Sequence, residues 1–193
     1  MQKKISPDSI RYRLITDFTR ESITDHLVTW SDAIHNNHQH MKPETAESLR
    51  NNLIFAVFAF HKGILVGAGG IMYPPEKKLL YNKRKVVEFR SVYHHPDFKK
   101  CGIATGLVLR RLKFVKENRL FPITLTQQPD MEPILRKTGW VLIEESFSRK
   151  LVPIKNGLRA CDCHSNKRLP FVGDRCSVCP MRNRFIWIHP ESL

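Results

Sequence analysis

A run of small and basic residues lies at the junction between an expected strand and an expected helix. In HPDFKKCGIAT, residues 95–105, Lys99 and Lys100 precede Gly102 and Ala104. Because Gly102 and Ala104 have almost no side chain, backbone N–H groups at a helix start there could approach a bulky anion. The partial positive charge of the helix N-terminus and the two lysines would add attraction. The spacing predicts a phosphate-binding loop, with a plain helix start as the alternative.

A carboxylate lies upstream of this loop and is a second candidate for chemistry. Glu88 stands eleven residues before Lys99, in the apolar stretch VVEF. Burial of a carboxylate among apolar side chains raises its pKa, which suits a general base. The alternative is a structural role, in which Glu88 pairs with Arg90 or with the basic run 83–85.

Four of the five cysteines lie close together near the C-terminus. They are Cys161, Cys163, Cys176 and Cys179, and His164 follows Cys163. Two close ligand pairs joined by a loop suit a tetrahedral ion. The spacing predicts a structural Zn²⁺ bound by Cys161, Cys176, Cys179 and either Cys163 or His164. An iron–sulfur cluster and free thiols are the alternatives.

Two further groups of residues have a weaker pattern. Cys101 lies beside the lysines at a helix start, where a thiolate and an acyl-cysteine intermediate are conceivable, but a spacer whose backbone matters is favoured. The histidines of HNNHQH, which are His35, His38 and His40, could suggest a metal. A polar helix end and loop is the favoured interpretation of these three residues.

Apolar periodicity and turn residues predict the elements that hold these groups. Strands are expected at 10–15, 54–63, 64–73, 86–95 and 121–128, with one or two more in 140–154 and one in 181–190. Helices are expected over 19–40, capped by Thr19 or Ser22, and over 43–52, 102–119 and 130–139. The stretch 74–85 is expected to be a charged loop. Residues Ile23, Leu27, Trp30 and Ile34 repeat at helical spacing.

Composition sets the broad class of the protein. The 193 residues are 41% hydrophobic, which indicates a globular chain, and we expect a domain over 1–154 and a cysteine-rich segment over 155–193. No apolar run approaches the roughly 20 residues of a membrane span, and the basic N-terminus lacks a signal-peptide core, so a cytoplasmic location is expected. The formal net charge of +14 favours polyanionic partners.

The order of these motifs resembles that of the GNAT superfamily of acetyl-CoA-dependent N-acetyltransferases. The family signature [QR]-x-x-G-x-[GA] is matched by Lys99, Gly102 and Ala104, with lysine in the first place. The segments VYHHPDF and ILRKTGW are similar to other family segments. The resemblance covers roughly residues 10–151. It implies an α/β (α+β) fold with a mixed, mostly antiparallel twisted sheet, splayed central strands and flanking helices.

The resemblance also implies a donor and its binding residues. Acetyl-CoA would place its pantetheine arm between strands 86–94 and 121–127. Backbone groups at Val92, Tyr93 and His94 would bind the arm and polarise the thioester. The loop residues Lys99, Lys100, Cys101, Gly102, Ile103, Ala104 and Thr105 would bind the pyrophosphate.

The catalytic residues follow in part from the same resemblance. A glutamate at the distance of Glu88 acts as base in some family members, directly or through water. Leu135 stands where many relatives have the tyrosine that protonates the departing thiolate. Tyr93 and Tyr81 are possible substitutes, although a packing or loop role is favoured for each. The thiol of the leaving group has a pKa of about 8.5, so its thiolate also leaves without much help from an acid.

Two functions from different classes are consistent with these residues. The first is transfer of an acetyl group, in a ternary complex, to a primary amine on a protein, a nucleic acid or a small molecule. The second is a basic nucleic-acid-binding module of the same fold, with chemistry lost or directed at a DNA base, tRNA or aminoacyl-tRNA. The basic residues around the cysteines, which are Lys167, Arg168, Arg175, Arg182 and Arg184, favour the second. A monomer or homodimer is expected in either case.

Overall fold

The computed structural model describes residues 6–37, 44–74, 80–81, 83–126, 129–142 and 185–189. The chain divides into two compact units, the first made of Met1–Tyr73 and Phe89–Phe114 and the second of Pro74–Glu88 and Val115–Leu193. Within the described ranges, no helix is both long enough and apolar enough to cross a membrane. The predicted domain boundary at residue 154 lies outside these ranges.

The first unit is built on antiparallel strands. β1 (Arg11–Ile15) pairs with β2 (Leu53–His61), and β2 pairs with β3 (Ile64–Met72). β5 (Arg84–His94) follows β3 in the strand order and contributes its residues from Phe89 onward to this unit. Lys62 (φ 50°) and Gly63 (φ 83°) form the left-handed pair that a two-residue hairpin between β2 and β3 needs.

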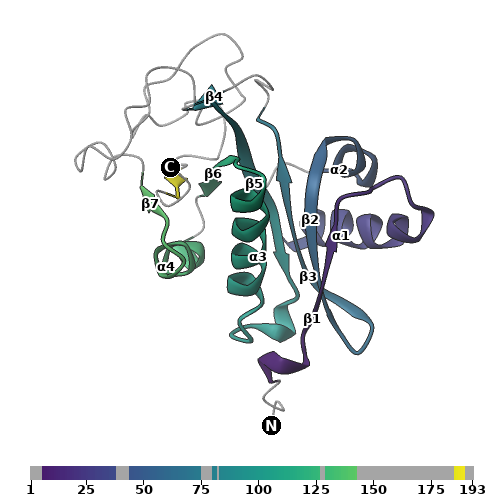
Figure 1. Cartoon of the computed structure of the whole chain (residues 1–193). Coiled ribbons are helices and arrows are strands. Elements are labelled where there is room, and N and C mark those ends of the chain that lie inside the picture. The colour runs from purple at the N-terminus through teal and green to yellow at the C-terminus, as the bar shows by residue number, and fades with distance from the viewer. Residues whose placement is uncertain are drawn as a thin grey trace, which may run out of the picture. The chain divides into compact units, whose positions relative to one another are not determined.

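Two helices cover one face of these strands (Figure 1). They are α1 (Thr24–Asn37) and α2 (Ala46–Asn52). The apolar residues predicted at helical spacing, Ile23, Leu27, Trp30 and Ile34, are all buried. They share one core with Phe58 of β2, Ala68 of β3 and Leu49 of α2. Thr45 caps α2 by accepting the backbone N–H of Ser48 at 3.0 Å.

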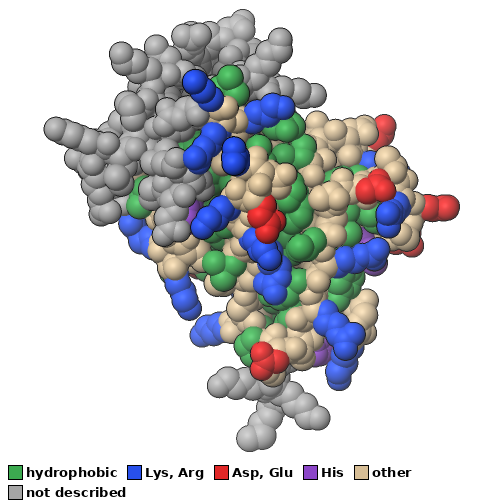
Figure 2. Space-filling view, viewed as in Figure 1, with side chains coloured by type: hydrophobic (Ala, Val, Ile, Leu, Met, Phe, Trp, Pro, Cys, Tyr) green, Lys and Arg blue, Asp and Glu red, His purple; other side chains and the backbone are tan. Residues whose placement is uncertain are grey.

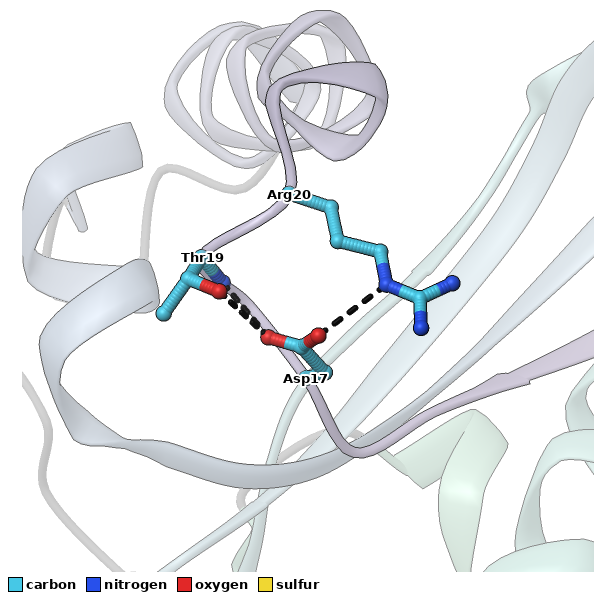
Figure 3. Close-up of polar contacts among 3 residues, drawn as sticks. All are labelled: Asp17, Thr19 and Arg20. Carbon is cyan, nitrogen blue, oxygen red and sulfur yellow. Dashed lines mark hydrogen bonds and ion pairs between the residues drawn. The ribbon is translucent and has the colours of Figure 1, made fainter.

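A small polar turn precedes α1 (Figure 3). Thr19 donates its hydroxyl to Asp17 Oδ1 at 2.6 Å, and its backbone N–H to the same oxygen at 3.1 Å. Arg20 Nε donates to Asp17 Oδ2 at 3.0 Å. The predicted helix cap at Thr19 or Ser22 is therefore wrong. Helical structure begins with the 3-10 turn Glu21–Ile23, and Arg20 occupies its cap position without a side-chain cap bond.

The helix α3 (Ile103–Glu117) crosses the opposite face of the first unit's strands (Figure 1). Phe114 stacks on Phe55 of β2, with ring centroids 4.0 Å apart. Near the start of the helix, the hydroxyl of Tyr12 in β1 fills the space where a Cβ at Gly106 would lie. The helix predicted over 102–119 is confirmed to within two residues at each end.

The second unit contains shorter strands. β6 (Phe121–Thr126) pairs with β8 (Phe185–Ile188), and β8 pairs with β7 (Val141–Leu142), all antiparallel. α4 (Glu132–Lys137) follows the 3-10 turn Pro129–Met131. The strand predicted within 181–190 is confirmed by β8, and the helix within 130–139 by α4.

One element of the second unit was not predicted. β4 (Leu80–Tyr81) pairs antiparallel with the start of β5, where Leu80 faces Lys85. The expectation of a charged loop over 74–85 is therefore wrong for Leu80–Tyr81 and for Arg84 and Lys85, which lie in strands. Lys83, in the turn between the two strands, adopts a left-handed conformation (φ 63°).

Candidate functional site

The predicted phosphate loop lies between the end of β5 and the start of α3. The 3-10 turn η3 (Pro96–Phe98) follows His95 and closes with a bond from Lys99 N to Pro96 O of 3.3 Å. The backbone then takes left-handed conformations at Lys100 (φ 64°) and Gly102 (φ 75°). A left-handed residue next to a right-handed one turns consecutive N–H groups to one side, as in many anion sites. The loop therefore offers donors to an anion.

Backbone N–H groups at the start of α3 extend this set of donors. The first helical bond runs from Gly106 N to Gly102 O at 2.9 Å. The N–H groups of Gly102 to Thr105 therefore have no acceptor inside the helix. A Cβ added at Gly102 would meet no described atom within 4 Å. There is thus open space at the Cβ position of Gly102.

The electrostatics of the loop favour an anion. The side chains of Lys99 and Lys100 are exposed, and the first turn of α3 contains no acidic residue. Figure 2 shows Lys and Arg side chains spread over the face that carries α3, with few Asp and Glu side chains among them. Cys101 makes two local contacts, from its Sγ to Lys99 O at 3.7 Å and from its backbone N–H to Phe98 O at 3.3 Å.

A glycine in β3 sets the position of the helix start. A Cβ added at Gly67 would lie 2.5 Å from Ile103 Cγ2 and 3.2 Å from the backbone oxygen of Tyr93. Three elements, β3, β5 and α3, therefore meet closely at this point. His95 N also donates to Val66 O at 2.9 Å, which ties the start of the loop to β3.

Side chains of β5 alternate between the two faces of the strand. The Phe89 ring lies under the guanidinium of Arg111 from α3, with Cζ 4.5 Å from the ring centroid. Arg90 turns to the other face, where its Nη1 lies 3.8 Å from Glu44 Oε1. Glu88 is 4% exposed, so the predicted base is buried within β5.

Past this point the strand is irregular. Ser91 adopts a left-handed backbone conformation (φ 54°) and is buried. Its carbonyl oxygen accepts the indole N–H of Trp30 in α1 at 2.9 Å. The sequence predicted Trp30 as an apolar core residue. Its polar contact was missed because a local sequence pattern cannot predict a hydrogen bond between residues 61 positions apart.

Tyr93, the proposed substitute acid, lies in the core between β5 and the helices α1 and α2. Burial raises the pKa of its hydroxyl above 10, so the group keeps its proton at neutral pH. The neighbouring side chains of Val92 and His94 are half-buried. The structure thus brings Tyr93 and Ser91 together with α1, and it brings the loop residues 99–105 together at the start of α3. Tyr81 lies in β4, and its side chain is outside the described set.

Arg111 was missed by sequence analysis. It is fully buried, and its Nε and Nη1 donate to Leu107 O and Gly70 O, each at 3.1 Å. Burial lowers the pKa of this guanidinium to about 9. A sequence signal was available, because Arg111 stands four residues from both Leu107 and Val115 on the apolar stripe of α3.

Polar groups of α1 and α2 gather near Glu44. Ser31 Oγ donates to Glu44 O at 2.6 Å, and Ser48 Oγ donates to Glu44 Oε2 at 2.7 Å. Glu44 therefore links both helices to Arg90 of β5. His35, near the end of α1, is exposed, in agreement with a polar helix end. His38 and His40 lie outside the described residues.

A family model described as "Acetyltransferase (GNAT) family" matches residues 15–135. The chain belongs to this family. The match includes β5, the loop and α3, and ends at Leu135. No curated protein matches the sequence.

Solved structures share the fold at low sequence identity. A GNAT acetyltransferase from Staphylococcus aureus has a TM-score of 0.54 and 14% identity, covering 92% of this chain and 98% of its own. A Brucella melitensis family member in complex with acetyl-CoA has a TM-score of 0.51 and 14% identity, covering 68% and 83%. N-acetylglutamate synthase from Neisseria gonorrhoeae, complexed with coenzyme A and N-acetyl-glutamate, has a TM-score of 0.55 and 13% identity, covering 93% and 35%.

The metal prediction for this GNAT protein falls on residues outside the described ranges. All five candidate ligands, Cys161, Cys163, His164, Cys176 and Cys179, lie there. Where side chains are described, no group of three or more His, Cys, Asp or Glu residues could hold a metal ion. The zinc site and its ligand set stay predictions.

Proposed function

We propose that this protein transfers the acetyl group of acetyl-CoA to a primary amine by direct attack within a ternary complex. The observation that carries the proposal is the loop Lys99–Thr105. There, two left-handed residues, unpaired helical N–H groups and two exposed lysines surround open space. The acetyl-CoA in the Brucella structure and the coenzyme A in the Neisseria synthase support the same ligand class.

In this proposal the backbone holds the donor. The N–H groups of Lys100 and of Gly102 to Thr105 bind the pyrophosphate, because the helix dipole and the two lysines favour its negative charge; the N–H of Cys101 donates to Phe98 O at 3.3 Å instead. Backbone groups of Val92, Tyr93 and His94 bind the pantetheine arm and polarise the thioester carbonyl. Holding the amine and the thioester in contact supplies most of the rate gain, since positioning alone is worth about 7–11 kcal/mol.

Glu88 accepts a proton from the acceptor ammonium, directly or through water. The neutral nitrogen then attacks the carbonyl carbon, the C–S bond breaks, and the CoA thiolate leaves with the bonding electrons. Because Leu135 is buried in α4 and has no proton to give, the thiolate leaves unassisted or takes its proton from Tyr93, whose raised pKa keeps it protonated. Deprotonation of the amine nitrogen completes the amide.

The decisive experiment is calorimetric titration with acetyl-CoA. Gly102→Glu places a bulky carboxylate in the open space of the loop, and binding should be lost. Gly63→Glu is the matched control: Gly63 also has a left-handed φ and open space around its Cβ position, so it adds the same charge and strain in the β2–β3 turn. The proposal is wrong if both variants bind acetyl-CoA as the wild type does.

Several finer points remain proposals of the same kind. The class of the amine acceptor is one of these points. Incubation of the protein with labelled acetyl-CoA and a panel of amines, followed by mass spectrometry, would identify it. Structural zinc in the segment 155–193, a cytoplasmic location, and a monomeric or homodimeric state rest on the sequence alone. Nucleic-acid binding also rests only on the net charge of +14 and the basic residues near the cysteines.

A further inference from the structure

The strand β5 contains a conformation that its own sequence does not favour. Ser91 has a φ of 54°, a left-handed value that is unfavourable for a residue with a Cβ. Ser91 is also buried, with 7% of its surface exposed. A buried non-glycine residue keeps such a conformation only when its surroundings hold it there.

The side-chain directions of β5 indicate that Ser91 forms a bulge. Arg90 reaches Glu44 on the face of α1 and α2, and Tyr93 lies in the core on that same face. In a regular strand, residues an odd number apart point to opposite faces. Arg90 and Tyr93 are three apart, so one extra residue is inserted between them, as in a β-bulge.

Trp30 contacts Ser91 from outside the strand. Its indole Nε1 donates to Ser91 O at 2.9 Å, and the side chain is fully buried. The ring meets Phe58 edge to face, with centroids 5.7 Å apart, and lies 3.1 Å from where a Cβ at Gly70 would be. Because the indole is enclosed on these sides, its N–H is a fixed donor.

The fixed bond determines where the next amide points. A trans peptide directs its C=O and its N–H in opposite directions. With Ser91 C=O turned towards Trp30, the N–H of Val92 is turned away from Trp30. Val92 belongs to the backbone segment that, in the proposed function, binds the arm and polarises the thioester carbonyl.

We propose that Trp30 is a positioning residue for the acyl group: its indole N–H holds the Ser91 carbonyl, and thereby directs the Val92 N–H to the thioester oxygen of acetyl-CoA. The inference rests on the proposed function, because it assigns a role within the same site. It adds a residue of α1, far from the loop Lys99–Thr105 in sequence, to the machinery that recognises the acetyl group.

The test compares the affinities of acetyl-CoA and CoA, which differ only in the acyl group. The wild type should bind acetyl-CoA more tightly than CoA. Trp30→Phe keeps an aromatic ring but removes the donor, and should reduce this preference about fivefold while CoA affinity stays near the wild-type value. Leu27→Ala, in the same helix and core, is the control for lost packing and should keep the preference.

A rescue variant separates positioning from general damage. Glycine adopts a left-handed φ without the cost that serine bears, so Ser91→Gly should hold the bulge without help from the indole. Added to Trp30→Phe, it should restore most of the preference for acetyl-CoA. The inference is overturned if Trp30→Phe keeps the preference, if Leu27→Ala loses it equally, or if Ser91→Gly gives no rescue.

A measurement on the wild type covers the case in which Trp30→Phe fails to fold. The indole ¹⁵N–H resonance of Trp30 is the one retained in both Trp140→Phe and Trp187→Phe. Acetyl-CoA should shift this resonance further than CoA does, and equal shifts overturn the inference. A wild type that binds neither ligand refutes the proposed function itself, whereas a wild type that binds both equally refutes only the role of Trp30.

Discussion

Glu88 is the residue whose chemistry is most open to measurement. It lies buried in β5 between Val87 and Phe89, and an amine must lose its proton before it attacks a thioester. We expect Glu88→Gln to lower kcat about 100-fold near pH 7, a size typical of a lost general base. The loss should shrink towards pH 10, where more of the acceptor is already neutral. Initial rates with a responsive amine from pH 6 to 10 provide the measurement.

A matched variant shows whether the effect belongs to this site. Glu47→Gln makes the same change of charge on an exposed position of α2 and should leave the pH–rate profile unchanged. If Glu88→Gln lowers kcat by the same factor at every pH, Glu88 has a structural role. The alternative that the sequence left open, pairing with basic neighbours, would then be favoured.

At the scale of elements, the position of α3 depends on the absence of a side chain in β3. Gly67→Ala would bring a Cβ to 2.5 Å from Ile103 Cγ2, so the first turn of the helix must move. We expect about 1–3 kcal/mol of lost stability, as for other overpacked sites, and weaker binding of acetyl-CoA. Denaturant unfolding and calorimetry measure the two effects.

The double variant Gly67→Ala, Ile103→Ala identifies the clash as the cause. Ile103→Ala removes the atom that the new Cβ meets. The double variant should therefore lose less stability than the sum of the losses in the two single variants. Strict additivity would contradict the contact. It would also mean that the glycine serves the flexibility of β3 and not the placement of the helix.

The turn before α1 gives a prediction for pH. Hydrogen bonds from the hydroxyl and the N–H of Thr19, and from Arg20, lower the pKa of Asp17 in the folded state. Below its ordinary value near 3.8, the unfolded chain therefore binds more protons than the folded one. The stabilisation is fully present above that value and is lost as the pH falls through the lowered folded pKa.

Asp17→Asn tests this turn directly. The difference in unfolding free energy between the wild type and the variant should be constant from pH 7 to 5 and should shrink as the pH falls from 4 to 2. Urea unfolding at each pH provides the measurement, since groups common to both proteins cancel. A difference that does not change with pH would mean that the contacts of Figure 3 do not favour the charged carboxylate.

Sequence patterns predicted those elements that local periodicity determines. Spacing alone located α1 and α3, and the small residues Gly102 and Ala104 marked the loop, because these signals lie within one segment. The left-handed conformation at Ser91 was not predicted, and neither was its contact with Trp30, because the two residues lie 61 positions apart in different elements. The pairing of β4 with β5 was also missed. The segment 74–85 is mostly charged, so its two residues Leu80 and Tyr81 gave no strand pattern.

At the scale of the whole molecule, basic side chains lie both on the surface and in the buried interior. The chain has 32 Lys and Arg residues against 18 Asp and Glu, and its exposed cations favour anionic ligands such as a phosphorylated cofactor. Arg111 is different, because it is fully buried and its described donors face the backbone carbonyls of Leu107 and Gly70. Burial lowers its pKa to about 9, which means that the protein opposes charge at this position.

Arg111→Lys should make the free energy of unfolding depend on pH, because burial disfavours the charged form of the new side chain. Lysine has an ordinary pKa near about 10.4, and burial at the same position should lower it into the measurable range. Between the lowered pKa of this lysine in the folded variant and its ordinary pKa of about 10.4, the unfolded chain binds more protons than the folded chain. The variant should therefore gain stability relative to the wild type as the pH rises from 6 to 9. The gain is at most about 1.4 kcal/mol per pH unit. Arg110→Lys, at a half-exposed neighbour, should show no such gain. Equal pH dependence of the two variants would mean that the interior of the molecule accommodates the charge at Arg111.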